Sequence, residues 1–272
     1  MTTAACAVRR VVGPVWLLAA IVSLAGCDLV MSDFSSQARD EWSRSYTLAA
    51  GGRVEVINVN GRIEVQPTAG ETVEVRADKV GRAATEEGAK AALGRIEIVE
   101  RVTEQLVRLE TRTTGSGFHM GGAEVRYFVR VPAGVEVNVR TVNGAVALER
   151  LAGEVTAATT NGSIKGDDLG GRVTASTTNG GIDIALARVP AGGVTLETTN
   201  GSIELQVPRD AAATISARLA NGRIDASGLA VEIDGEASRR RLDGRLNGGG
   251  EHLRLETTNG SIRIRGKTSS DE

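Results

Sequence analysis

The sequence predicts an all-β fold in which one chain winds as a β-solenoid, a stack of coils made of parallel strands. The dipeptide Asn-Gly recurs seven times within one frame of alternating apolar and polar residues, and three copies read Thr-Thr-Asn-Gly-Ser-Ile without change. Every copy of a repeat must solve the same folding problem, so the repeat decides the architecture. The asparagines of the seven copies are Asn60, Asn143, Asn161, Asn179, Asn200, Asn221 and Asn259.

The residues around each asparagine predict two strands with one buried face. The positions six before and three after the asparagine are Val, Ile or Leu in every copy. The positions four before and five after are Val, Ile, Leu or Ala, with Gly166 as the exception. The residues between them on the approaching strand are mostly Thr, Ser or Ala. Alternation with a period of two, rich in Val, Ile and Thr, is typical of half-buried strands.

Two geometries can place Asn-Gly between such strands. In an antiparallel meander each Asn-Gly would be a type I′ hairpin turn, because both residues tolerate positive φ. In a solenoid it would be a corner between parallel coils. From Asn143 onward the asparagines recur at intervals of 18, 18, 21, 21 and 38 in the numbering. A solenoid needs this uniformity, so we expect coils of 18–21 residues over residues 135–266, interpret the last interval as about two coils, and expect stacked asparagines to form a ladder.

Residues 1–26 have the pattern of a signal peptide, with Arg9 and Arg10 before an apolar stretch. Leu24, Ala25, Gly26 and Cys27 resemble the lipobox of bacterial lipoproteins, which implies cleavage after Gly26 and acylation of Cys27, for example with palmitate. A plain secretory signal and a short membrane anchor are the alternatives, although residues 11–26 are fewer than the roughly 20 that span a bilayer. Residues 27–42 are expected to be a polar tether, and residues 267–272 a frayed tail.

Between the copies at Asn60 and Asn143 the chain leaves the frame, and residues 43–134 are expected to form an N-terminal β subdomain that caps the solenoid. Residues 82–93 are rich in Ala, Glu and Lys and predict one short helix ending at Gly94. Residues 96–102 and 105–111 alternate as a hairpin pair, and residues 123–131 predict a further strand. A terminal coil without a cap would expose an edge that promotes aggregation, so a cap is expected here.

Two stretches suggest a family. Residues 127–134, Tyr-Phe-Val-Arg-Val-Pro-Ala-Gly, lead into the second copy of the repeat, and residues 246–264 form the closing copy. Both resemble the bacterial "putative adhesin" family, a broad group of envelope proteins with β-solenoid domains. The resemblance covers residues 46–266. It implies the fold, an envelope location and an adhesin-like or sensing role, and it supplies no catalytic residues.

Motifs for chemistry are scarce, so we expect no metal and no cofactor. His119 and His252 share no metal-ligand spacing with each other or with cysteines. Residues 166–171, Gly-Asp-Asp-Leu-Gly-Gly, resemble a calcium-binding repeat but occur once, which favours a simple turn. Residues 239–241 are three arginines in a loop that could touch anionic lipid or glycan. Phe118, His119 and Met120 lie on a glycine-rich tip, where contact with a partner competes with a plain hairpin loop.

Charge and composition narrow the function. Removing residues 1–26 takes away two arginines and no acids, so 30 basic residues face 34 acidic ones, a net charge of −4 that argues against nucleic acid as a partner. Polysaccharide-active β-helices group acids and bases on the outer face of adjacent coils, whereas Glu197, Arg218, Arg254 and Glu256 are expected to be isolated among Thr, Ser and Ala, and aromatic residues make up 3% of the chain. The sequence therefore predicts a non-enzymatic interaction or structural protein, lipid-anchored in the bacterial cell envelope, facing the periplasm or the cell surface, with an envelope protein or glycan as partner. A regulatory sensor of envelope state is the alternative, and the membrane leaflet and the oligomeric state stay open.

Overall fold

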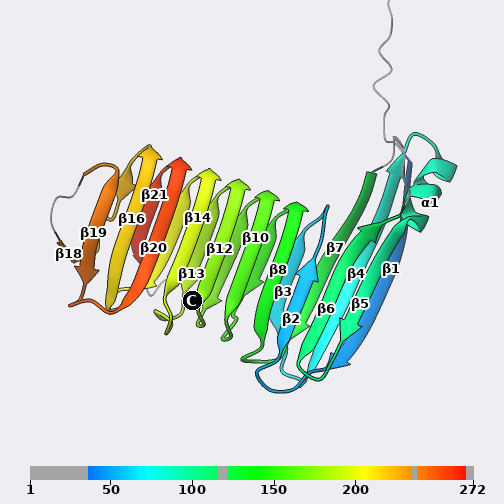
Figure 1. Cartoon of the computed structure of the whole chain (residues 1–272), viewed down its shortest axis with the longest axis horizontal. Helices are drawn as coiled ribbons and strands as arrows, with labels where there is room; N and C mark the ends of the chain where they lie inside the picture. Colours follow the sequence, from blue (N-terminus) through cyan, green and yellow to red (C-terminus); the bar gives the residue numbers. More distant parts are fainter. Residues whose placement is uncertain (1–35, 115–121, 235–237, 268–272) are drawn as a thin grey trace, which may run out of the picture. The chain divides into compact units, whose positions relative to one another are not determined.

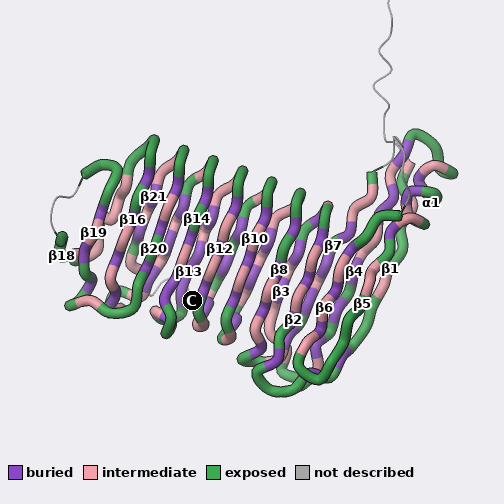
Figure 2. The backbone as a smooth tube through the Cα atoms, viewed as in Figure 1, coloured by how far each residue is buried: buried purple, intermediate pink, exposed green. Residues whose placement is uncertain are grey.

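The computed structural model describes residues 36–114, 122–234 and 238–267. Within these residues two β-sheets lie face to face, together with one helix, α1 (Glu86–Gly94) (Figure 1). Buried residues alternate with more exposed ones along most strands, so the core lies between the sheets (Figure 2). The predicted all-β class is confirmed.

Each coil contributes one strand to each sheet. In order across the sheet, sheet A consists of β1 (Ser36–Thr47), β4 (Thr72–Ala83), β7 (Gly122–Val131), β3 (Ile63–Pro67), β9 (Val146–Glu149), β11 (Ile164–Leu169), β13 (Ile182–Leu186), β15 (Ile203–Pro208), β21 (Ile262–Lys267) and β17 (Ile224–Asp225). In order from the opposite end of the stack, sheet B consists of β18 (Val231–Ile233), β19 (Arg241–Leu246), β16 (Ala213–Asn221), β20 (Glu251–Asn259), β14 (Val194–Asn200), β12 (Val173–Asn179), β10 (Val155–Asn161), β8 (Glu136–Asn143), β2 (Arg53–Ile57), β6 (Leu106–Thr113) and β5 (Ile96–Val102).

The coils stack in parallel and in register. Val155 pairs with Val173, and Val173 pairs with Val194, so each residue pairs with its equivalent in the next copy of the repeat. In sheet A, Ile164 pairs with Ile182 and Ile182 with Ile203 in the same way. This parallel pairing confirms the solenoid over the antiparallel meander. The residues that the frame places inside, such as Val54, Leu196 and Ile203, are fully buried.

The order of the stack differs from the order of the chain. The repeat predicts that each coil lies on the preceding one, but β14 pairs with β20 and not with β16. The last coil, β20 with β21, is inserted between β14–β15 and β16–β17, and β16 is the outer neighbour of β20. The long interval before Asn259 is therefore not two coils, because the chain between Asn221 and Asn259 forms β18 and β19, which pair antiparallel at the outer side of β16.

The N-terminal part extends the same two sheets. Strands β2 and β3 of the first copy stack directly on β8 and β9, so residues 43–134 and 135–266 share one core. Strands β6 and β7 form a further parallel coil that carries no Asn-Gly, and β5, β4 and β1 close the end by antiparallel pairing. The predicted hairpin and the strand before Pro132 are present, and α1 begins later than predicted, with Thr85 as its N-cap.

Strand β1 corrects the predicted tether. Residues 36–42 fall within the predicted tether, but they form the first half of β1, which pairs with β4 over twelve positions. The charged residues of β1 suit an edge strand with one solvated face, so this sequence is hard to distinguish from a linker. Trp42 nevertheless packs against the core. Residues 1–35, which include the predicted signal peptide and lipobox, lie outside the described residues, as do Phe118, His119 and Met120.

Close approach of backbones explains the glycine of each corner. Asn and Gly both tolerate positive φ, but among the seven copies only Gly61, Gly222 and Gly260 adopt it, with φ of 120°, 140° and 157°. A Cβ built on Gly180 would lie 1.9 Å from the carbonyl oxygen of Gly162 in the neighbouring coil. The same clash, at 1.7–2.1 Å, recurs at Gly61, Gly144, Gly162, Gly201, Gly222 and Gly260. The glycines therefore form a column in which any side chain would separate the coils.

A bulge fills the one gap in the apolar frame. Gly166 has no side chain to offer the core, and the register of β11 against β13 shifts between Gly166 and Leu169. Asp168 adopts a left-handed conformation with φ of 56°. Among the described non-glycine residues, only Arg150 and Asn247, both with φ of 49°, do the same. Leu169 is fully buried and lies where a side chain on Gly166 would otherwise point. The motif of residues 166–171 therefore serves packing.

Candidate functional site

The seven repeat asparagines lie side by side in one hydrogen-bonded ladder along the corner edge. In stack order, each side-chain amide after the first donates from Nδ2 to Oδ1 of the preceding asparagine, at 2.8 or 2.9 Å. In stack order the ladder runs Asn60, Asn143, Asn161, Asn179, Asn200, Asn259 and Asn221. At its end, Asn60 Nδ2 donates to the carbonyl oxygen of Ala123. The predicted ladder is thus present, with the same interchange of the last two coils.

A second column lies under the asparagines, and the repeat frame does not indicate it. Two residues before five of the asparagines stands a buried threonine whose hydroxyl donates to a glycine carbonyl of the neighbouring coil at 3.0–3.4 Å. These are Thr141, Thr159, Thr177, Thr198 and Thr257. In the first copy Asn58 takes this place and donates to Gly61 and Val125 carbonyls. Together the two columns make the corner edge rigid.

We expect Asn179→Ala to lower the free energy of unfolding by about 1–2 kcal/mol. Asn179 donates to Asn161 and accepts from Asn200, and each net hydrogen bond contributes roughly 0.5–1.5 kcal/mol. Urea unfolding followed by circular dichroism measures the change. Asn221→Ala is the control, because Asn221 makes only the donated ladder bond and should lose about half as much. Equal losses would contradict a ladder in which interior members make two bonds.

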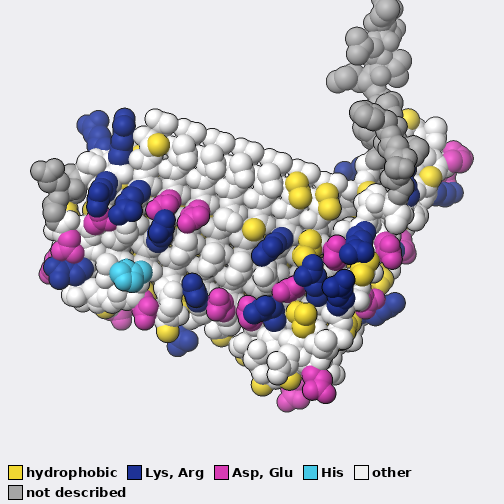
Figure 3. Space-filling model, in the orientation of Figure 1, with side chains coloured by type: hydrophobic (Ala, Val, Ile, Leu, Met, Phe, Trp, Pro, Cys, Tyr) yellow, Lys and Arg dark blue, Asp and Glu magenta, His cyan; other side chains and the backbone are white. Residues whose placement is uncertain are grey.

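The outer face of sheet B combines uncharged and charged regions. Thr, Ser and Ala side chains occupy the outer positions of β10 and β12, and charged side chains gather over β19, β16 and β20 on one side and over β2, β6 and β5 on the other (Figure 3). A shallow hollow of about 620 Å³ lies over β12, β14, β20 and β16, where Glu197, Glu256 and Arg218 line it.

The inserted coil brings together residues that are distant in sequence. Arg254 of β20 lies 3.0 Å from Glu256 and 3.9 Å from Glu197 of β14, and Arg218 lies 3.7 Å from Asp243. The prediction that these side chains are isolated is wrong, because β20 lies between β14 and β16 and places Glu256 beside both Glu197 and Arg218. Asp243 also accepts from Arg241 at 2.6 Å, and that bond, with one from the Ser216 hydroxyl, lowers the pKa of the Asp243 carboxyl. The acids and bases of this cluster neutralise one another.

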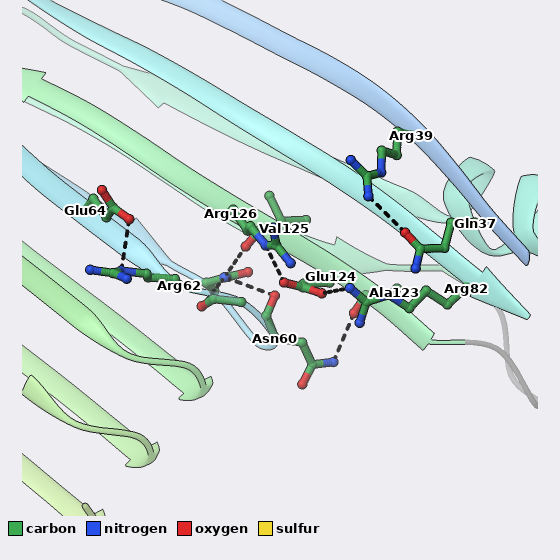
Figure 4. A network of polar contacts seen from close by, with 12 residues as sticks. Gln37, Arg39, Asn60, Arg62, Glu64, Arg82, Ala123, Glu124, Val125 and Arg126 are labelled. Carbon is green, nitrogen blue, oxygen red and sulfur yellow. Dashed lines mark hydrogen bonds and ion pairs between the residues drawn. The ribbon is translucent and has the colours of Figure 1, made fainter. Parts of the chain in front are cut away.

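The outer face of sheet A carries a second cluster of charged and aromatic side chains, which the sequence does not indicate. Side chains from β3, β7 and β4 lie next to one another there, because Arg62 and Arg126 occupy neighbouring positions, as do Glu64, Phe128 and Arg76. Glu124 accepts a hydrogen bond from Arg126 at 2.6 Å and forms an ion pair with Arg82 at 2.9 Å, and Arg62 lies 2.9 Å from Glu64 (Figure 4). The ion pair between Arg82 and Glu124 links the neighbouring strands β4 and β7 above the sheet, whereas the other two join residues two positions apart in the chain.

Two adjoining hollows make this face a groove along β3 and β7, called the sheet A groove below. Each has a volume of about 700 Å³, within the usual range for binding sites. Glu64 and Phe128 line both hollows. The Arg76 guanidinium lies 4.4 Å from the centre of the Phe128 ring, a cation–π contact, and Arg130 and Gln66 extend the lining. The groove therefore offers both charge signs and a flat guanidinium–aromatic stack.

Titratable groups elsewhere have structural roles. Burial raises the pKa of Tyr127 to about 12, while its hydroxyl shares a 2.7 Å hydrogen bond with Thr111. Burial, with the bond to Glu100, raises the pKa of Tyr46, which ties β1 to β5 at the end of the sheets. Across the described ranges no group of three His, Cys, Asp or Glu side chains is placed to hold a metal ion. His252 is exposed on β20.

We expect Asp183→Asn to stabilise the protein at pH 7. Burial, and next the charge of Glu204 on the adjacent strand, raise the pKa of the Asp183 carboxyl above 3.8. A raised folded pKa disfavours the ionised form, so Asp183 destabilises the fold once the pH rises through that pKa. The urea midpoint of the variant should exceed that of the parent at pH 7, and the gain should vanish near pH 3, where both states are protonated. A gain that persists at pH 3 would contradict this.

Comparisons with known proteins identify a family. The family model described as Toastrack DUF4097 matches residues 53–265. Comparison with curated proteins gives no match. Similar solved structures include a putative cell adhesion protein from Clostridium sporogenes, with 13% identity, a TM-score of 0.49 and coverage of 85% of this chain and 100% of that one. They also include a putative adhesin from Bacteroides fragilis, with 11% identity, a TM-score of 0.33 and coverage of 84% and 97%.

In the described part of the chain, no helix has both the length and the apolar character that crossing a membrane requires.

Proposed function

The chain belongs to the Toastrack DUF4097 family, and from this premise we propose that it is a non-enzymatic interaction protein of the bacterial cell envelope, anchored by lipid on Cys27. The lipobox match at residues 24–27 supports the anchor. The sheet A groove supports the interaction role, and it is the observation on which the proposal depends. The partner that this groove fits is a segment of an envelope protein.

The chemistry of the groove favours a protein segment. Arginine and aromatic side chains are enriched at the centres of protein interfaces, and Phe128 with Arg62, Arg76, Arg126 and Arg130 supplies both. Glu64, Glu74 and Glu124 alternate with these cations, so the groove complements a segment that carries both charge signs. The groove lies on paired strands, so its side chains need little ordering when a partner binds.

Capture from detergent-solubilised envelopes tests the interaction. The full chain at native expression, carrying an affinity tag, should retain a specific envelope protein. Phe128→Ala and Arg62→Ala should each weaken that binding by tenfold or more, the loss expected for a central contact. Thr174→Ala on the outer face of sheet B is the matched control and should bind as the parent does. Capture of glycan alone, or of nothing, would contradict the proposal.

Two further measurements test the lipid anchor and the non-enzymatic role separately. Labelling cells with a palmitate analogue should mark the chain, and Cys27→Ser should abolish both the label and membrane retention. Incubating the chain with a panel of polysaccharides should give no turnover. Turnover that is lost in Glu197→Gln or Arg218→Ala would show an enzyme and refute the non-enzymatic role.

A further inference from the structure

The inserted coil is held from both sides by groups that belong to the rest of the chain. Its inward residues Leu253, Leu255, Ile262 and Ile264 are fully buried. Asn259 donates to Asn200 on one side and accepts from Asn221 on the other, both at 2.9 Å. Without this coil, β14–β15 and β16–β17 would face each other across a slot one coil wide, because parallel strands lie about 4.8 Å apart.

We propose that two copies of this chain exchange their C-terminal coils, residues 251–267, so that each copy fills the slot of the other. The partner is a second copy because the slot presents the complement of the repeat frame itself. Its carbonyl at Gly201 accepts from Thr257, and its strands pair with β20 and β21 in register. A coil from another copy makes the same contacts, which is why exchange of an identical element is a low-cost route to a dimer.

The connection before the coil is suited to opening. Asn247, Gly248 and Gly249 are three consecutive residues with φ of 49°, 86° and 90°. Asn and Gly are the residues that adopt left-handed backbone at the lowest cost, so the sequence suits this tight turn. The closed turn is held by bonds from Asn247 Nδ2 to the carbonyls of Arg209 and Ala211. An exchanged coil would extend this turn, which Gly248 and Gly249 permit because glycine populates both signs of φ.

The coil directly follows its hinge in the chain. Exchange would also complete the charged cluster of sheet B from two copies, because Arg254 and Glu256 would come from the partner and Glu197 and Arg218 from the recipient.

A disulfide across the edge of the slot reports which copy supplies the coil. Ser202 of the recipient and Ser261 of the coil have hydroxyl oxygens 3.1 Å apart and precede the paired residues Ile203 and Ile262, a spacing that a disulfide can bridge. Full chains with Ser202→Cys and with Ser261→Cys carry different tags and are co-expressed and oxidised in detergent. Exchange predicts a covalent heterodimer whose linked peptides contain residues 202 and 261. Each single variant alone shows whether other cysteines contribute.

Variants of the hinge, residues 247–249, provide a second test of the exchange. Gly248→Ala should raise the heterodimer fraction about tenfold, because an L-residue disfavours the closed turn and no atom lies within 4 Å of its Cβ. Gly228→Ala is the matched control, since Gly228 has φ of 87° and equally open surroundings but lies outside the hinge. Absence of the 202–261 heterodimer in every variant would overturn the proposal. An equal rise with Gly228→Ala would overturn the role of the hinge. The double variant Ser202→Cys/Ser261→Cys should give covalent dimers, and a link found only within one chain would also refute exchange.

Discussion

A chain that ends at Asn247 is expected to lose the cooperative fold of its C-terminal half. The deletion removes the inserted coil, in which four aliphatic side chains are fully buried. At roughly 1.5–3 kcal/mol for each side chain, burial in this coil contributes about 6–12 kcal/mol, which is comparable with the whole stability of an ordinary domain. The strands outside it, β16 and β17, would lose their only parallel neighbours in the described stack.

Urea unfolding and limited proteolysis measure this loss. The truncated chain should show a lower m value and rapid cleavage between residues 209 and 246, because less surface is buried in a cooperative unit. A chain that ends at Lys267 is the control, since it keeps the complete coil and should unfold as the parent does. Protection of residues 213–246 in the shorter chain would mean that β16 can pair with β14 directly, and would contradict the interior role of the coil.

Gly180→Ala is expected to destabilise the protein by about 3 kcal/mol or more, at or above the upper end for overpacking. The added Cβ would lie 1.9 Å from the carbonyl oxygen and 2.5 Å from the carbonyl carbon of Gly162, and both atoms belong to paired backbone that cannot rotate away. The coils must separate at this corner, so the ladder bonds beside Gly180 would lengthen as well. Thermal and urea unfolding measure the effect.

Gly94→Ala separates this effect from a general loss of glycine. No atom lies within 4 Å of a Cβ at Gly94, and this residue has no positive φ. We expect the stability of this control to stay within about 0.5 kcal/mol of the parent, as for surface substitutions elsewhere. A small effect of Gly180→Ala, close to that of the control, would show that the corner can adapt and that the glycine column is not required.

The repeat frame is sufficient to predict the coils, because the period of two and the fixed intervals both reflect core positions. The parallel pairing, the asparagine ladder and the family resemblance are confirmed. The order of the last two coils does not follow from the aliphatic frame, which the copies at Asn221 and Asn259 share. The threonine position differs between them, because Thr257 donates to the Gly201 carbonyl whereas the copy at Asn221 has Leu219 in that place. The β18–β19 hairpin outside β16 is the second distinguishing feature.

The candidate site is harder to predict than the fold. Phe128 and Arg76 belong to strands that pair antiparallel outside the frame, and Glu64 belongs to a strand whose parallel pairing with β7 joins distant parts of the sequence. Outward positions of strands follow no apolar period, so nothing in the sequence marks them as neighbours. The threonine column has a local signal in the sequence, because each threonine stands two positions before the asparagine. A polar residue at that position is nevertheless expected to face solvent, so the sequence does not predict its burial.

The head-to-tail orientation of the asparagine ladder has an electrostatic consequence. Every side-chain amide points its N–H toward β7, so seven small dipoles add along the corner edge much as peptide dipoles add in a helix. The Asn60 end is partly positive and is capped by the Ala123 carbonyl, whereas the Asn221 end carries partial negative charge. Arg223 and Arg239 lie around Asn221, where cations are favoured. The corner edge therefore carries a net dipole, and the direction of the repeated hydrogen bond sets the direction of that dipole.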